Sequence, residues 1–159
     1  MSLAQTAIGE LKAAQDYFNR STRNLREEDS TFTPVEGMMT AAQQVAHAAH
    51  TIGWFVEGAF RPEGFDMNWE EHAKTVMGYT SLAAAKAWFN REIEDACGAI
   101  AGKSDAELAA PMPPGPIMGG LPHMAVFGGI TDHTAHHRGA LTVYARLKGI
   151  VPPMPYMDM

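Results

Sequence analysis

The sequence predicts an all-α protein that folds as an antiparallel four-helix bundle. Three observations predict this class. Four long segments repeat apolar residues at helical spacing, and each segment is delimited by capping residues, glycine or proline. No segment shows the convincing alternation of a strand. The chain has 159 residues, of which 46% are hydrophobic and 19% charged, the composition of a folded globular domain. We therefore expect residues 1–159 to form one domain.

The first helix is expected from about Ser2 to Asn24, and a polar connection broken by Pro34 follows it. The second helix should begin after Thr40, because Thr40 and Gln43 have the spacing of a capping box, and should continue to about Ala59. This helix carries an apolar stripe on one side. The roughly opposite stripe is polar and aromatic, and comprises Gln43, His47, His50 and Trp54. With so little charge, the helix should be covered on both sides.

Residues 61–79 show no sustained helical period and are expected to form a long connection. A third helix should follow, with Thr80 or Ser81 as its N-terminal cap and Gly102 just past its end. Beyond it, Ser104 and the acidic residue three positions later have the form of a capping box for one short helical turn.

Residues 111–122 contain five prolines and three glycines, which exclude regular helix and predict a second long loop. The fourth helix is expected from about Pro122 to Lys148. Gly149 should stop it, and two prolines at 152 and 153 prevent its continuation.

The charge balance and cysteine count exclude several functional classes. Twelve Lys and Arg against eighteen Asp and Glu give a net charge of −6, without a basic run, which argues against nucleic acid as the main partner. The single cysteine, Cys97, excludes an internal disulfide and a cysteine-based zinc cluster, and is expected in the core. No stretch of about 18 apolar residues predicts a membrane span, and the first residues lack a signal peptide. We therefore expect a cytoplasmic protein.

The histidines are the most informative residues. His133 and His137 are four residues apart on the fourth helix, so their rings project from one face, the spacing with which two imidazoles bind one metal ion. Because apolar residues flank them, the pair should point into the bundle. A third ligand would come from His47 or His50 on the second helix. Three imidazoles leave coordination positions open, as catalytic metal sites do.

A carboxylate could orient one of these ligands, and Asp132 and Glu57 are the candidates. The alternative is a purely structural histidine core, but burying several imidazoles without a charged partner is costly. The chain has no His-Glu-x-x-His and no paired Glu-x-x-His motifs, so a common metalloprotease and a ferritin-like di-iron bundle are not expected. Nucleotide-binding loops are also absent.

The sequence resembles the DinB/YfiT-like superfamily. The resemblance rests on the capped segment TAAQQVAH at 40–47, on DHTAHHRG at 132–139, and on YARLKG at 144–149 with the two prolines that follow. It implies an up-down-down-up four-helix bundle, often dimeric, in which three histidines hold a divalent metal. By position the resemblance places the ligands at His47, His133 and His137, with His50 as the alternative to His47. Ala140 stands where the family often has Gln.

The same resemblance implies a metal-dependent enzyme, because the family includes transferases and isomerases that use bacillithiol, mycothiol or glutathione-type thiols. We therefore expect S-transfer that uses Zn or Ni and a low-molecular-weight thiol as cofactors. A small-molecule substrate would enter between the segments 61–79 and 111–122. The alternatives are a metal-dependent hydrolase and a non-enzymatic, stress-related bundle that binds metal or a partner. A homodimer is also expected.

Overall fold

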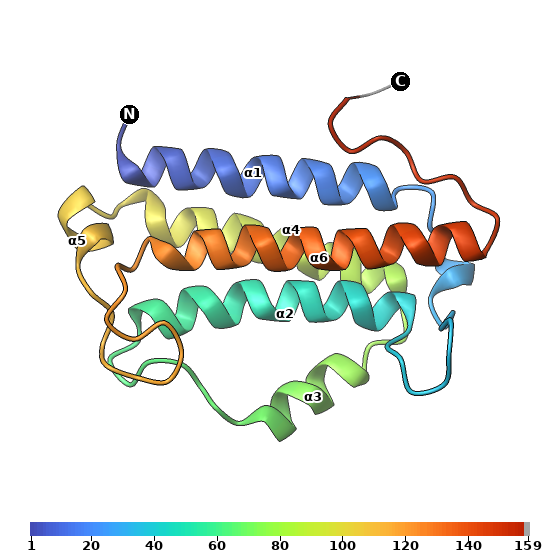
Figure 1. The fold of residues 1–159 in the computed structure, drawn as a ribbon, viewed down its shortest axis with the longest axis horizontal. Coiled ribbons are helices and arrows are strands. Elements are labelled where there is room, and N and C mark those ends of the chain that lie inside the picture. The colour runs from blue at the N-terminus through green and yellow to red at the C-terminus, as the bar shows by residue number, and fades with distance from the viewer. Residues whose placement is uncertain (158–159) are drawn as a thin grey trace.

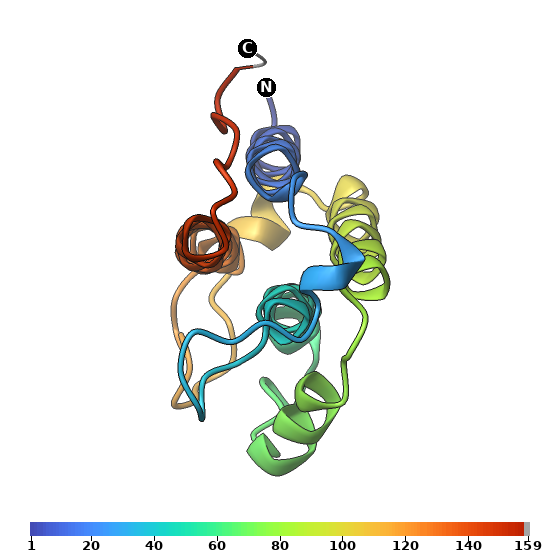
Figure 2. The same cartoon turned by 90° about the vertical axis from the view of Figure 1, so that its right-hand side faces the viewer.

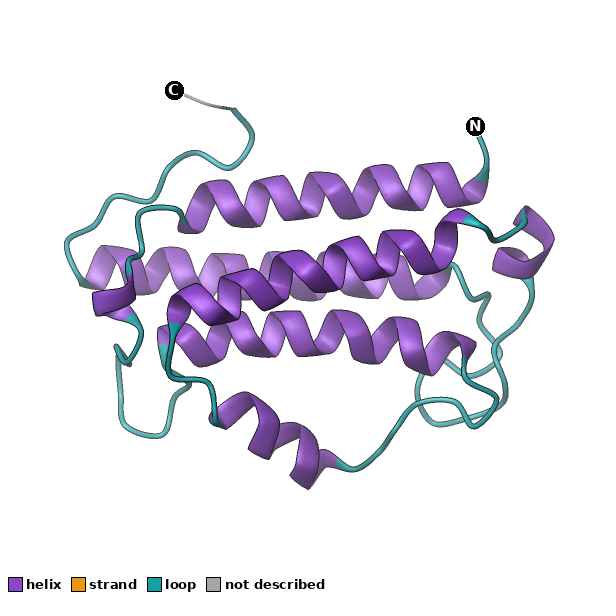
Figure 3. Ribbon diagram, turned by 180° about the vertical axis from the view of Figure 1, so that it is seen from behind, coloured by secondary structure: helices purple, strands orange, loops and turns teal. Residues whose placement is uncertain are grey.

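The structure, a computed structural model, describes residues 1–157, and the regular secondary structure in that part of the chain is all helical. Figure 3 draws no strand there, and the sole β feature is an isolated bridge between Pro111 and Pro122. This confirms the predicted all-α class. The elements are α1 (Leu3–Thr22), η1 (Glu27–Asp29), α2 (Ala41–Phe60), α3 (Trp69–Met77), α4 (Leu82–Ala101), α5 (Asp105–Ala109) and α6 (Ala125–Leu147).

The four long helices α1, α2, α4 and α6 form the bundle. Viewed end-on they occupy four corners, and α1 packs against α6, α6 against α2, α2 against α4, and α4 against α1 (Figure 2). In Figure 1, α1 and α6 run from left to right whereas α2 and α4 run from right to left, which is the up-down-down-up order. Because neighbours α2 and α4 run in the same direction, the chain between them must return along the bundle. That return segment contains α3, which lies outside against α2.

Side-chain caps begin the helices where the sequence predicts. The Thr40 hydroxyl accepts a hydrogen bond from the Gln43 backbone N–H at 3.3 Å, and the Gln43 side chain accepts one from the Thr40 N–H at 2.9 Å. Ser81 caps α4, and the predicted capping box at Ser104 begins α5. Past the end of α6, Gly149 has a φ of +74°, a left-handed conformation that glycine adopts without strain.

Two boundaries differ from the sequence-based prediction. Residues 69–77, expected as part of a connection, form helix α3, and Asn68 caps its N-terminus. Only Val76 of this helix is buried, so its sequence lacks the apolar stripe that identifies a helix. Helix α6 begins at Ala125 rather than near Pro122, because the backbone N–H groups of residues 123 and 124 bond back to carbonyls of 110 and 108.

The core is packed closely around α2. Phe18 of α1 and Phe89 of α4 stack with ring centroids 4.1 Å apart, and both are fully buried. Many of the buried residues of α2 are alanines, whose small side chains let α4 and α6 approach its backbone. Cys97 is buried in this core as predicted, and burial raises the pKa of its thiol. None of the helices within residues 1–157 is long and apolar enough to cross a bilayer.

An ion pair joins the turn after α1 to the end of α6. Asp29 is 2% exposed, and its carboxylate contacts Lys148 Nζ at 2.7 Å and accepts a hydrogen bond from the Arg26 backbone N–H at 2.8 Å. Burial alone would raise the pKa of Asp29, but the bonds from Lys148 and Arg26 outweigh it and hold this pKa below the ordinary 3.8. The charged form is therefore favoured in the folded state.

Asp29→Asn should lower the free energy of unfolding at pH 7 by about 1–2 kcal/mol, less than for a fully buried pair because the Lys148 side chain is 30% exposed. A lowered folded-state pKa stabilises the fold above the unfolded value, and this contribution is lost as pH falls through the folded value. The difference between wild type and variant should therefore shrink below pH 3.8 in urea denaturation curves. Asp16→Asn, at an exposed position on α1, is the matched control; an equal effect there would contradict the assignment.

Candidate metal centre

Three histidines from two helices converge inside the bundle, as the sequence predicts. His47 lies on α2, and His133 and His137 lie one turn apart on α6. Their ligand nitrogens all lie within 4.8 Å of one another. The Nε2 atoms of His133 and His137 are 3.2 Å apart, close to the ~3.4 Å that two tetrahedral ligands with metal–nitrogen bonds of about 2.0–2.1 Å would show. The three side chains are thus within reach of one common ion.

The three imidazoles are neutral at physiological pH. Burial, reinforced by the neighbouring imidazoles, lowers the pKa of His137 to about 3 and that of His133 to about 4. Burial also lowers the pKa of His47, and His136 adds to the effect. A neutral imidazole keeps a lone pair on one ring nitrogen, which is the form that binds metal. The site therefore needs no proton loss at pH 7 to become a set of nitrogen donors.

A buried hydrogen-bond chain orients one of these rings. His137 Nδ1 lies 2.5 Å from Oε1 of Gln44, an oxygen that only accepts, so Nδ1 carries the proton. The Gln44 amide donates to the Tyr144 hydroxyl at 3.3 Å, which in turn donates to the Met39 carbonyl at 2.8 Å. With its proton on Nδ1, His137 presents a bare Nε2 toward His133.

Gln44 therefore takes, at His137, the orienting role that was expected of Asp132 or Glu57. Asp132 is exposed on α6, and Glu57 is exposed and pairs with Arg61 at 3.5 Å. The sequence pattern that could have identified Gln44 is its position three residues before His47, which places both side chains on the same face of α2. Its uncharged amide is also easier to bury than a carboxylate.

The remaining histidines lie outside the cluster. The alternative ligand, His50, is one turn beyond His47, and its ring contacts those of His72 and Trp88 at centroid distances of 4.8 and 6.0 Å. His136 is exposed, although its ring is 4.9 Å from that of His137. The structure thus favours His47 over His50 as the third member.

A mostly apolar cavity of about 440 Å³ adjoins the three histidines, and His47 and His133 form part of its wall. Helix α3 closes the opposite side through Trp69, Val76 and neighbouring residues. The segment before α3 is held by Trp54, whose Nε1–H donates to the Asp66 carbonyl at 2.7 Å. Of the two segments expected at the substrate entrance, residues 61–79 are partly helical and contribute to the cavity wall. Residues 111–122 do not line this cavity.

The donor set fits a divalent transition metal. Three neutral imidazole nitrogens suit Zn, Ni, Cu or Fe, whereas Mg and Ca prefer oxygen ligands. A set of three protein ligands leaves room in the coordination sphere for a further group, and the adjoining cavity provides space for one. A structural zinc site, by contrast, would have four protein ligands.

Comparison with known proteins agrees with the fold described above. No curated protein matches the chain. Among solved structures, a DinB-like protein from Bacillus cereus ATCC 10987 shares 18% identity with a TM-score of 0.70, covering 95% of this chain and 93% of that one. A DinB-like protein from Bacillus subtilis shares 15% identity with a TM-score of 0.69, covering 97% and 99%. The sequence model of the DinB superfamily matches residues 10–141, most of the chain, and the protein therefore belongs to the DinB superfamily.

Proposed function

We propose that the protein is a divalent-metal-dependent enzyme in which His47, His133 and His137 hold the metal. The observation that carries this proposal is the convergence of three neutral imidazoles, two of them in the wall of a cavity large enough for a small molecule. When bound there, Zn or Ni would lower the pKa of a coordinated thiol or water, producing a nucleophile at neutral pH. The apolar wall would hold an uncharged electrophile and keep bulk water away from it.

Thiol S-transfer is the activity we favour, with a low-molecular-weight thiol as the nucleophile. The chain cannot supply this thiol, because its single cysteine, Cys97, is buried in the core and burial raises its pKa. A diffusible thiol would therefore have to enter the cavity beside the histidines. The chemistry also fits a reducing cytoplasm, where we propose that the protein acts as a homodimer.

Metal hydrolysis is the second candidate. His50 and His72 line the cavity without belonging to the metal-binding set, and an imidazole in that position can accept a proton from water. Burial, followed by the proximity of His72, lowers the pKa of His50, which keeps it in the basic form at pH 7. A non-enzymatic, metal-binding bundle is the third alternative and predicts no turnover at all.

The purified protein should bind one Zn or Ni ion per chain, measured by elemental analysis after loading and desalting. His47→Ala, His133→Ala and His137→Ala should each lose most of this metal, because two imidazoles hold an ion far more weakly than three. His50→Ala, one turn along the same helix, is the matched control and should retain it. Equal metal loss in the His50 variant would contradict the ligand assignment.

Gln44→Leu should weaken metal binding by about 10–100-fold, since it removes the acceptor that fixes the His137 tautomer. Gln44→Glu keeps an acceptor at the same place and should restore most of the affinity. Competition with a metal-chelating dye gives the affinities, and helical circular dichroism shows whether each variant is folded. Unchanged affinity in a folded Leu variant would show that Gln44 does not position the ring.

The metal-loaded protein should transfer glutathione or bacillithiol to a model electrophile such as a chlorodinitrobenzene. Chelation and His133→Ala should abolish this turnover, whereas Cys97→Ala should retain it. Hydrolysis of an activated ester without added thiol would favour the hydrolase instead. Metal that raises the melting temperature without any turnover would favour the non-enzymatic bundle.

A further inference from the structure

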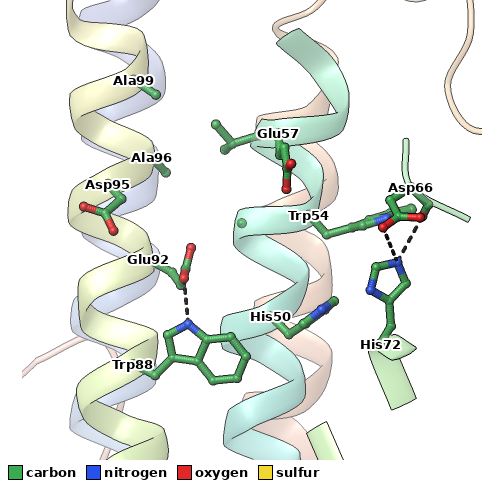
Figure 4. Close-up of a pocket in the computed structure, with 12 residues that line it drawn as sticks. His50, Trp54, Glu57, Asp66, His72, Trp88, Glu92, Asp95, Ala96 and Ala99 are labelled. Carbon is green, nitrogen blue, oxygen red and sulfur yellow. Dashed lines mark hydrogen bonds and ion pairs between the residues drawn. The ribbon is translucent and has the colours of Figure 1, made fainter. Parts of the chain in front are cut away.

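A second cavity, of about 430 Å³, lies between α2 and α4. Figure 4 shows two indole rings in its wall, those of Trp54 and Trp88, together with carboxylates that come from three different segments. Its size falls in the range of small-molecule sites. No Lys or Arg belongs to its lining, so its polar groups are imidazoles and acids; the carboxylates are those of Glu57, Asp66, Glu92 and Asp95.

Among the acidic side chains of this wall, Glu92 is fixed in place by contacts of both its carboxylate oxygens. Its Oε1 accepts a hydrogen bond from Trp88 Nε1 at 2.6 Å (Figure 4). Its Oε2 lies over Gly53 of α2, only 2.6 Å from the position that a Cβ would occupy there. A glycine at 53 therefore makes room for the carboxylate. Within residues 1–157 no donor is paired with Oε2, which leaves this oxygen available to a ligand.

The lining carries four carboxylates and no Lys or Arg, although Arg61, outside the lining, pairs with Glu57 at 3.5 Å. Burial raises the pKa of Glu92; the Trp88 bond opposes this shift, and Asp95 adds to it by repulsion. Arg91 acts in the opposite direction, but its side chain is exposed and lies outside the lining. A cation placed between these acids would relieve the repulsion.

The occupant we infer is an organic cation rather than a metal ion. Among residues 1–157, the one group of His, Cys, Asp or Glu side chains close enough to share an ion is the His47, His133 and His137 set. The carboxylates of this second cavity are too dispersed for that purpose. Indole faces attract ammonium groups, and a carboxylate oxygen with free lone pairs accepts their N–H. Tyr79 stacks on one face of the Trp88 indole with ring centroids 4.8 Å apart, so an ammonium group would contact the part of that ring that Tyr79 leaves open.

We propose that this cavity binds the primary ammonium group of a small organic amine, which donates to Glu92 Oε2 and lies against the indole of Trp88. The site is separate from the metal centre. His50, Trp54 and His72 line both cavities, and none of them is a proposed metal ligand. The proposal therefore does not depend on metal binding and can be tested in the presence of a chelator.

The test is a titration of the full chain with n-butylammonium, followed through the indole N–H signals in NMR spectra. The expected dissociation constant is on the order of millimolar, as for other very small ligands, and at least ~10-fold lower than that of n-butanol, which is similar in size but uncharged. Equal binding of the alcohol would overturn the proposal. Equal binding of tetramethylammonium, which has no N–H, would overturn the proposed hydrogen bond.

Glu92→Gln should weaken n-butylammonium binding by at least ~10-fold. Glu94→Gln removes the same charge from an exposed position on α4, where Glu94 pairs with Lys12, and should leave binding unchanged. Gly53→Ala tests the same carboxylate from α2, since the added Cβ would displace it, and should also weaken binding. Undiminished binding in either a folded Glu92→Gln or a folded Gly53→Ala variant, or an equal loss in Glu94→Gln, would contradict the assignment.

Discussion

The partly buried contact between His47 of α2 and the His133–His137 pair of α6 is the constraint on which the rest of the site depends. Neutral imidazoles gathered away from water keep their lone pairs available but lack the charged partners that usually compensate for burial. Gln44, whose amide is held by Tyr144, satisfies the outer nitrogen of the His137 ring. The Nε2 atoms of His133 and His137 are left facing one another. A bound divalent ion would satisfy those remaining nitrogens together.

The order of the helices explains where the cavities lie. Because α2 and α4 are parallel neighbours, the chain between them crosses the outside of the bundle and places α3 over α2. The polar and aromatic stripe of α2 is therefore covered by its neighbours: His47 contacts α6, and His50 contacts α3 and α4. His47 contributes to the cavity beside the metal centre, while His50 and Trp54 lie between that cavity and the acidic one. One helix face thus contributes to two sites of different chemistry.

The sequence predicted the bundle and the histidine set because both arise from short-range patterns. Caps at Thr40, Ser81 and Ser104 are encoded within four residues, and the spacing of His133 and His137 follows from helix geometry. Helix α3 was missed because Val76 is its only buried residue. Gln44 and Glu92 were missed because their roles depend on residues far away in the chain. Their partners, His137 and Gly53, are brought to them by tertiary packing alone.

The most direct test of the central claim is a crystal structure of the metal-loaded protein with anomalous diffraction recorded at the metal absorption edge. We expect one peak per chain, about 2.0–2.1 Å from a nitrogen of each of His47, His133 and His137, with at least one further coordination position facing the apolar cavity. A loaded crystal with no peak between these rings, or with the metal bound elsewhere, would contradict it.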